Sequence, residues 1–324
     1  MMRWLICLLL VSLNSCERSD DSSPHLVLYS SIDDSYARLV CREYEKSAGV
    51  KVDLVTDSEA SKSSGLVQRL IAEKARPVAD VFWSGDPMRA FKLEAAGVGT
   101  KVGGGPSRVR LIVFNTRLVT AKQTPAQVEE LVKPEFAGRT CFANPLFGTS
   151  SMHAAVLLQA WGRERAERFF TTLSKSGGRM VASNGEVKRR VANGEFAFGI
   201  TDSDDVAVGL GEGKNLAFIV PDQEVGDMGA VIIPAVPVLI NNAPHSEAAS
   251  QFADYLVSPQ VQSLLAASDA EFLPATINVQ APVSHLRLDL SQLKRAPDLT
   301  ASTAAEFEVW EREFLESWVA KQLQ

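Results

Sequence analysis

The sequence predicts an α/β fold built from two similar units, and three observations support this prediction. The spacing of apolar residues switches repeatedly between short continuous runs, typical of buried strands, and the three-to-four-residue spacing of helices. The same alternation starts again after residue 116. The chain also has 324 residues, 46% of them hydrophobic, which suits roughly two domains with large cores. Continuous apolar strands separated by helices indicate mostly parallel sheets covered by helices on both faces.

The first unit contains three strands, each followed by a helix. The strands are predicted from apolar runs, and the helices from apolar residues that repeat on one face. Gly49 and Gly97 mark two helix ends, and Asp86-Pro87 opens the third helix. In chain order the elements are a strand at 25–30, a helix from 32 to about 49, a strand at 50–55, a helix around 66–71, a strand at 79–83 and a helix from 87 to about 97.

The second unit repeats this order and is followed by a helical C-terminal part. Its predicted elements are strands at 109–116, 139–145, 179–183, 196–201 and 230–240, with helices at 149–162, 186–194, 246–257 and 260–267. A last helix carries Phe307, Trp310, Phe314 and Trp318, three to four residues apart. We expect this aromatic stripe to pack onto one of the units rather than to form a binding face.

The N-terminus has the features of a secretory signal. Arg3 precedes the apolar run WLICLLLVSL, which is too short for a permanent membrane anchor. The following LNSC resembles a bacterial lipobox, which implies a signal peptide at 1–15, a lipid on Cys16 and a flexible tether at 16–24. An ordinary signal peptide with an incidental cysteine is the alternative. We expect a periplasmic or cell-envelope protein, lipid-anchored after secretion, in which Cys41 and Cys141 are buried thiols.

Composition and motifs argue against two classes of function. The formal charge of −6 gives no basic surface of the kind that nucleic-acid binding needs. Residues 148–152 lack the last glycine of a nucleophile elbow, no dinucleotide fingerprint follows the first strand, and the four histidines show no triad order. We therefore expect neither a nucleic-acid partner nor an enzyme.

Short polar side chains follow most of the predicted strands, at the edge where ligands of α/β proteins bind. Each also precedes a helix, whose unpaired N–H groups and positive dipole end favour an anion. Capping of the helix is the simpler interpretation for any single residue, and Asp202 or Ser203 fits it. Capping does not explain why both units collect such residues, or why two acids stand side by side. The predicted ligand-binding residues are Ser30, Ser31, Ser58, Ser84, Asp86, Thr149, Ser150, Asn184, Asp204 and Asp205.

Four stretches carry a resemblance to a known family: ADVFWSGDP, KPEFAGRTCFANPLFGTSS, GEFAFGITDSDDV and PHSEAASQFADYLVSPQVQ. They are similar to the solute-binding proteins of ABC importers, and more narrowly to the ferric-ion-binding branch of the type II periplasmic-binding fold. The resemblance covers roughly residues 26–275.

This resemblance implies a two-lobed protein that closes on a small ligand by hinge motion. The implied lobes are 25–110 with 236–324, and 111–235, joined by strands near 111–115 and 230–239. The resemblance also implies a monomer that delivers its ligand to a permease in the inner membrane.

The chain departs from the family where the family holds its ligand. Ferric-binding relatives place two adjacent tyrosines where Asp204 and Asp205 stand here. The first hypothesis, which we keep as the nominal assignment, is that Asp86, Asp204 and Asp205 hold ferric iron or another hard cation as the transported ligand, with a synergistic anion at Thr149 and Ser150.

The other hypothesis is an organic ligand with opposite charges at its ends, such as an aminoalkylphosphonate or a phosphorylated amine. Its phosphoryl group would bind Ser30, Ser31, Ser58 and the helix start at residues 148–151, and its ammonium group would face the aspartates. A surface lipoprotein that senses a ligand is the alternative from another class.

Overall fold

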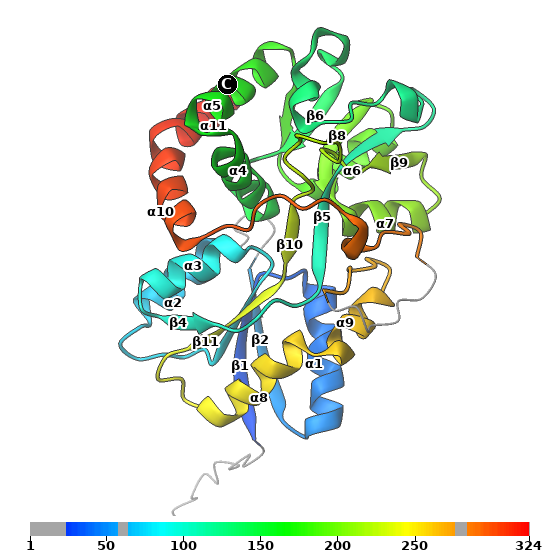
Figure 1. Ribbon diagram of the computed structural model, residues 1–324. Helices are drawn as coiled ribbons and strands as arrows, with labels where there is room; N and C mark the ends of the chain where they lie inside the picture. The colour runs from blue at the N-terminus through cyan, green and yellow to red at the C-terminus, as the bar shows by residue number, and fades with distance from the viewer. Residues whose placement is uncertain (1–23, 58–63, 276–283, 324) are drawn as a thin grey trace, which may run out of the picture.

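The computed structural model describes residues 24–57, 64–275 and 284–323, and it shows two α/β lobes (Figure 1). The first lobe is the lower one in the figure and the second lobe is the upper one, with β5 and β10 running through the middle. Ser58, Cys16 and the predicted signal peptide lie outside the described residues. Within the described ranges, no helix is both long enough and apolar enough to cross a membrane.

The first lobe contains a five-stranded sheet in the order β2-β1-β3-β11-β4. Its strands are β1 (His25–Ser30), β2 (Lys51–Thr56), β3 (Val81–Ser84), β4 (Gly99–Lys101) and β11 (Val236–Ile240). Its helices are α1 (Asp34–Ala48), α2 (Ser64–Ala72), α3 (Pro87–Ala95), α8 (Ser246–Val257) and α9 (Pro259–Ala266). Leu26 and Leu28 of β1 pack with α1 and α8, whereas Tyr29 packs with α2 and α3 on the other face. Because both faces are buried, β1 has the continuous apolar run expected for such a strand.

The second lobe contains six strands, in the order β10-β5-β8-β6-β7 with β9 paired to β5. The strands are β5 (Ser107–Asn115), β6 (Thr140–Ala143), β7 (Arg179–Val181), β8 (Phe198–Asp202), β9 (Leu216–Ile219) and β10 (Ile232–Pro234). The helices are α4 (Gly148–Trp161), α5 (Arg163–Lys175), α6 (Asn184–Ala192) and α7 (Ser203–Gly211). The sequence patterns gave no separate prediction for α5, which follows α4 directly at Gly162, or for the short strand β9.

Both sheets are mixed, whereas we expected mostly parallel ones. The strands joined by helices are parallel as predicted: β1 pairs with β2 and β3, and β6 pairs with β7 and β8. The strands that carry the chain between the lobes are antiparallel to their neighbours, namely β5 to β8, β10 to β5, and β11 to β3 and β4. Short apolar runs predict a strand but contain no information about which neighbour it meets or in which direction.

The chain leaves the first lobe earlier than we expected. Strand β5 lies wholly in the second sheet, so the crossing is the segment 102–106 between β4 and β5 rather than 111–115. The return crossing agrees with the expectation, because only Ala235 separates β10 in one sheet from β11 in the other. Beside these crossings, Ser107 at the start of β5 and Leu273 exchange two backbone hydrogen bonds, with N–O distances of 2.8 and 2.9 Å.

The C-terminal helices pack on the second lobe, although the expected boundary placed 236–324 in the first. Helix α10 (Ala301–Trp310) continues through a π-helical turn (Glu311–Leu315) into α11 (Glu316–Gln322). The pair lies against α4 and α5, and α10 also contacts α3 of the first lobe, where Lys92 pairs with Glu308. The ring centroids of Trp310 and Trp318 are 5.9 and 5.1 Å from that of Phe170 on α5. The aromatic stripe packs as predicted. Because Trp310 and Trp318 pack on Phe170 of α5, the C-terminal helices lie on the second lobe and not on the first, where we expected them.

We predict that Trp310→Ala will lower the free energy of unfolding by about 3 to 5 kcal/mol, because it removes a large buried ring from the contact with Phe170. Val309→Ala on the same helix is the matched control, since Val309 is 41% exposed. Urea unfolding of both variants measures the difference. Equal losses for the two variants would contradict this packing of α10 against α5.

Candidate functional site

A cavity of about 230 Å³ lies between the two lobes. The first lobe contributes Ser31, Asp33 and Gly85 to its wall. The second lobe contributes the remaining lining residues: Arg108, Ala143, Asn144, Phe147, Gly148, Thr149, Ser150, Ala182, Ser183, Asn184, Gly185, Asp202, Asp204 and Asp205. The site is therefore assembled from both lobes, at the edge where the sequence predicted polar side chains to gather.

Three helices of the second lobe begin at this cavity: α4, α6 and α7. They meet there because β6, β7 and β8 are mutually parallel, so the residues that follow these strands emerge at one edge of the sheet. No side chain caps the start of α4, whose residue before the helix is Phe147. The positive end of the α4 dipole is therefore directed at the cavity wall formed by Gly148, Thr149 and Ser150.

A buried ion pair between Arg110 and Asp202 connects these three helix starts. Arg110 Nη1 on β5 lies 2.7 Å from Asp202 Oδ1 and 3.0 Å from Asn184 Oδ1. The other carboxylate oxygen of Asp202 accepts hydrogen bonds from Thr149 Oγ1 at 2.5 Å and from Asn184 Nδ2 at 3.1 Å. Arg110 is only 2% exposed. One cation and one carboxylate thus tie the first residues of α4, α6 and α7 together.

Either Asp202 or Ser203 was expected to cap the helix that follows β8, and the structure gives both residues different roles. Asp202 stands at the N-cap position of α7, but its side chain makes no capping hydrogen bond. The hydroxyl of Ser203 accepts a hydrogen bond from the backbone N–H of Val109, at 3.1 Å, and does not cap the helix either. The Arg110 guanidinium competes successfully for the Asp202 carboxylate, because a charged donor binds it more strongly than a backbone N–H.

Asp204 and Asp205 both line the cavity, as predicted, and both have protein partners. Asp204 Oδ2 lies 3.3 Å from Arg108 Nε, and Asp205 Oδ2 accepts a hydrogen bond from Thr201 Oγ1 at 2.9 Å. Burial raises the pKa of Asp204 to about 8 and the pKa of Asp205 to about 6. The Arg108 charge opposes this rise at Asp204, whereas the neighbouring Asp202 charge adds to it. The acids therefore hold protons more tightly than free aspartates do, so a cationic ligand must displace these protons and binds more strongly as the pH rises.

The structure brings six of the ten predicted residues into the cavity wall: Ser31, Thr149, Ser150, Asn184, Asp204 and Asp205. Ser30 and Ser84 are fully buried in the first lobe and do not line it. Their hydroxyls donate hydrogen bonds to backbone carbonyls, of Trp83 and Asp86 respectively. These two serines satisfy the backbone at the ends of their own strands.

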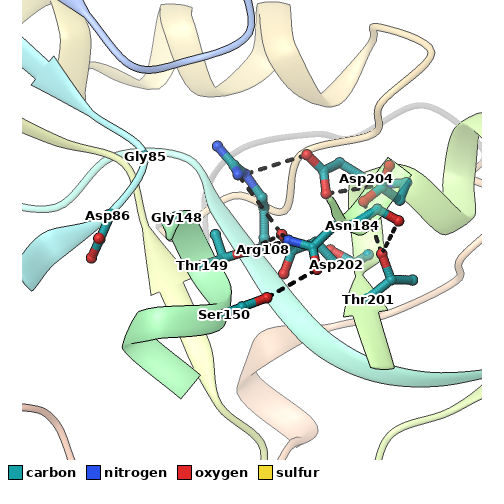
Figure 2. Close-up of polar contacts among 12 residues, drawn as sticks. Gly85, Asp86, Arg108, Gly148, Thr149, Ser150, Asn184, Thr201, Asp202 and Asp204 are labelled. Carbon is teal, nitrogen blue, oxygen red and sulfur yellow. Dashed lines mark hydrogen bonds and ion pairs between the residues drawn. The ribbon is translucent and has the colours of Figure 1, made fainter. Parts of the chain in front are cut away.

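Asp86 also lies outside the cavity, so the predicted trio of Asp86, Asp204 and Asp205 is not brought together. Its side chain caps α3 by accepting a hydrogen bond from the N–H of Met88 at 2.9 Å, and it pairs with Arg89 Nε at 3.2 Å. Ser151 Oγ of the second lobe donates to it at 3.3 Å. Figure 2 shows the Asp86 carboxylate apart from those of Asp202 and Asp204. Asp86 therefore caps a helix and contacts the other lobe.

The carboxylates that do lie together belong to Asp202, Asp204 and Asp205. One oxygen from each lies within 4.8 Å of the others, a spacing that a single cation can bridge. No tyrosine, histidine or cysteine is among the described residues that line the cavity. A cation here would meet only oxygen ligands, which suits hard ions and ammonium groups.

Sequence reasoning missed Arg108 and Arg110, the two cations of the site. We interpreted the segment around 109–116 only as an apolar strand. The two arginines are two residues apart, so on a strand they point to the same face, and this spacing was the available signal. Two charged residues on one face of a buried strand indicate that this face meets acidic partners.

Comparisons with known proteins agree with this architecture. A family model described as "Bacterial extracellular solute-binding protein" matches residues 29–268. The Iron uptake protein A1 of Synechocystis sp. is 25% identical over 298 residues, which cover 80% of this chain and 81% of that protein. The Putative 2-aminoethylphosphonate-binding periplasmic protein of Salmonella typhimurium is 23% identical over 249 residues, covering 71% of this chain and 72% of that protein. Among solved structures, iron-bound HitA from Pseudomonas aeruginosa has the same fold, with a TM-score of 0.77 at 21% identity over 90% of this chain and 99% of that one.

We predict that Arg110→Met will destabilise the protein by about 3 to 5 kcal/mol, because it leaves the Asp202 carboxylate buried without its charged partner. Arg189→Met on α6 is the control: its side chain is 57% exposed, and surface pairs such as Arg189–Glu186 contribute at most about 1 kcal/mol. Denaturant unfolding compares the two. If Arg110→Met lowers the free energy of unfolding no more than Arg189→Met does, Arg110 does not stabilise the buried Asp202 carboxylate.

A second prediction concerns Asp205→Asn in the protein without ligand. The raised pKa of Asp205, about 6, means that the folded state binds this proton more tightly than the unfolded state. The contribution of Asp205 to the free energy of unfolding of the natural protein must then fall as the pH rises from about 4 through about 6. Asparagine keeps an acceptor for Thr201 but does not titrate.

We therefore expect the Asp205→Asn variant to be about 1 to 2 kcal/mol more stable than the natural protein at pH 8, with the difference shrinking toward pH 4. Thermal unfolding at both pH values measures this. A stability difference that is independent of pH would show that burial does not disfavour the charged carboxylate.

Proposed function

Because this chain belongs to the bacterial extracellular solute-binding proteins, we propose that it is the solute-binding component of an ABC importer. It captures a small solute between its lobes and delivers it, chemically unchanged, to a membrane permease. It acts in the periplasm or at the cell envelope, as a monomer, anchored by a lipid on Cys16. Family membership supports capture of a solute; delivery to the permease, the anchor and the monomeric state are proposals.

One observation carries this proposal: a cavity between two lobes is lined on one side by the open start of α4 and on the other by a cluster of acids. Among the residues that the structure describes, the first lobe contributes only Ser31, Asp33 and Gly85, so separation of the lobes would expose the second-lobe residues to solvent. A cavity whose wall is completed by a second lobe suits capture by hinge closure.

The ligand that this geometry supports best is a small organic solute with an anionic group and an ammonium group. The start of α4, with Gly148, Thr149 and Ser150, suits a phosphonate or phosphate. Asp204 and Asp205, on α7, suit the ammonium group. A relative named as a 2-aminoethylphosphonate-binding protein supports this solute class.

Ferric iron with a synergistic anion is the second candidate, favoured by the spacing of Asp202, Asp204 and Asp205. The three carboxylates would hold the ion as cargo, and the anion would occupy the α4 start. A relative named as an iron uptake protein supports this candidate. The site nevertheless has two arginines beside these carboxylates, and both would repel a metal ion.

The ligand that co-purifies with the protein tests the assignment directly. The chain from Glu17 onward would be expressed without the lipid anchor and examined by native mass spectrometry and elemental analysis. A small organophosphorus mass supports the first candidate, and about one iron per chain supports the second. A protein that binds neither class in calorimetry would contradict both.

We predict that Asp204→Asn combined with Asp205→Asn will weaken binding of 2-aminoethylphosphonate, or of ferric citrate if iron is the cargo, at least about 100-fold. The reason is that both ligands place their positive charge against these carboxylates. Glu212→Gln is the control, since this exposed acid stands at the other end of α7. Calorimetry measures the affinities, and unchanged affinity in the double variant would contradict the proposed site.

A further inference from the structure

Arg108 lies between the two lobes at the cavity. It is the second residue of β5, and its Nε lies 3.3 Å from Asp204 Oδ2 while its Nη1 lies 4.0 Å from Asp202 Oδ2. From the first lobe, the ring of Phe272 lies under the guanidinium, with 5.1 Å between the guanidinium carbon and the ring centroid. Figure 2 shows the side chain directed at Asp204. A cation of the protein itself therefore stands beside the acid cluster.

Gly85 provides the space for this guanidinium. A β-carbon at position 85 would lie 2.9 Å from Arg108 Nη2 and 3.3 Å from Ile32 Cδ1. The first distance is shorter than real contacts allow, so any side chain at position 85 would displace the end of Arg108. The backbone of Gly85 does not have a positive φ, so the close approach of Arg108 is the reason for glycine here.

This arrangement decides which charges the cavity can accept. A cation bridging Asp202, Asp204 and Asp205 would share two of these carboxylates with Arg108, and the two positive charges would repel each other. A solute that also carries a phosphonate or carboxylate relieves that repulsion, because the guanidinium offers several N–H donors to such a group. The ammonium group of the same solute can then bind the carboxylates of Asp202, Asp204 and Asp205.

We propose that Arg108 is a specificity-determining residue: it is a resident counter-ion, accommodated by Gly85, that admits solutes with both an anionic and a cationic group and selects against a bare metal cation. This inference rests on the proposed function and narrows its ligand class. It assigns to one residue the choice between the two candidate cargoes.

The test compares the natural protein with Arg108→Gln, Arg108→Lys and Gly85→Ala in two titrations. The first probe is terbium(III) chloride, a hard cation without an organic anion, and the second is 2-aminoethylphosphonate. Arg38→Gln is the matched control, because this arginine on α1 has a 54% exposed side chain. Circular dichroism and thermal unfolding verify that each variant is folded.

The Arg108→Gln variant should bind terbium at least tenfold more tightly than the natural protein does. The Arg108→Lys variant keeps the positive charge and should show no such gain in affinity. Terbium binding by Arg108→Gln that is equal to or weaker than that of the natural protein overturns the inference. This arm does not depend on the identity of the natural solute.

For 2-aminoethylphosphonate, Arg108→Gln should lose about 10- to 100-fold in affinity, which is the value of a lost charge-assisted hydrogen bond. Gly85→Ala, which moves the guanidinium but keeps its charge, should lose less. Unchanged binding by Arg108→Gln also overturns the inference. A natural protein that fails to bind this probe, together with tighter terbium binding by Arg108→Gln, would overturn the proposed solute class and leave the role of Arg108 as resident counter-ion supported.

Discussion

The ion pair between Arg110 and Asp202 is the interaction on which the site depends. Each group is buried, so neither would be stable there without the other, and each uses its remaining hydrogen-bonding capacity on Thr149 or Asn184. A pair of this kind adds little net stability compared with an apolar contact. Its effect is to fix where three helices begin, and with them the backbone N–H groups and carboxylates that face the cavity.

The cavity has many charges but is largely neutralised from within. Arg110 pairs with Asp202, Arg108 pairs with Asp204, and burial favours the protonated form of Asp205. A cleft that closes must exclude water from these groups, and unpaired charges would then oppose closure. Because these charges are paired within the protein, the lobes can lie close together without a ligand. A ligand that binds must then displace some of the existing ion-pair partners.

The sequence contained enough local information to predict most elements, and six of the ten predicted site residues line the cavity. The residues of β1 and α1 show the pattern of a buried strand and a one-faced helix, so their bounds were predicted within about two residues. Asp86 and Asp204 look alike in the sequence, since each is an acid near a helix start that follows a strand. Only the fold distinguishes them: Asp86 turns back to cap α3, while Asp204 faces Arg108. Contacts between residues far apart in sequence, such as Arg110 with Asp202, have no local signal, and the direction of β5 against β8 has none either.

The chain passes between the lobes three times: at 102–106, at Ala235, and again at Phe272 and Leu273, which pack in the cores of the first and the second lobe respectively. Two bodies joined at a single point can swivel in any direction, whereas three connections side by side restrict them to rotation about one axis. We therefore expect the lobes to open and close about one axis. Any solute that stabilises the closed form opposes the rotation through which it must leave, so tighter binding of the solute makes its release correspondingly slower.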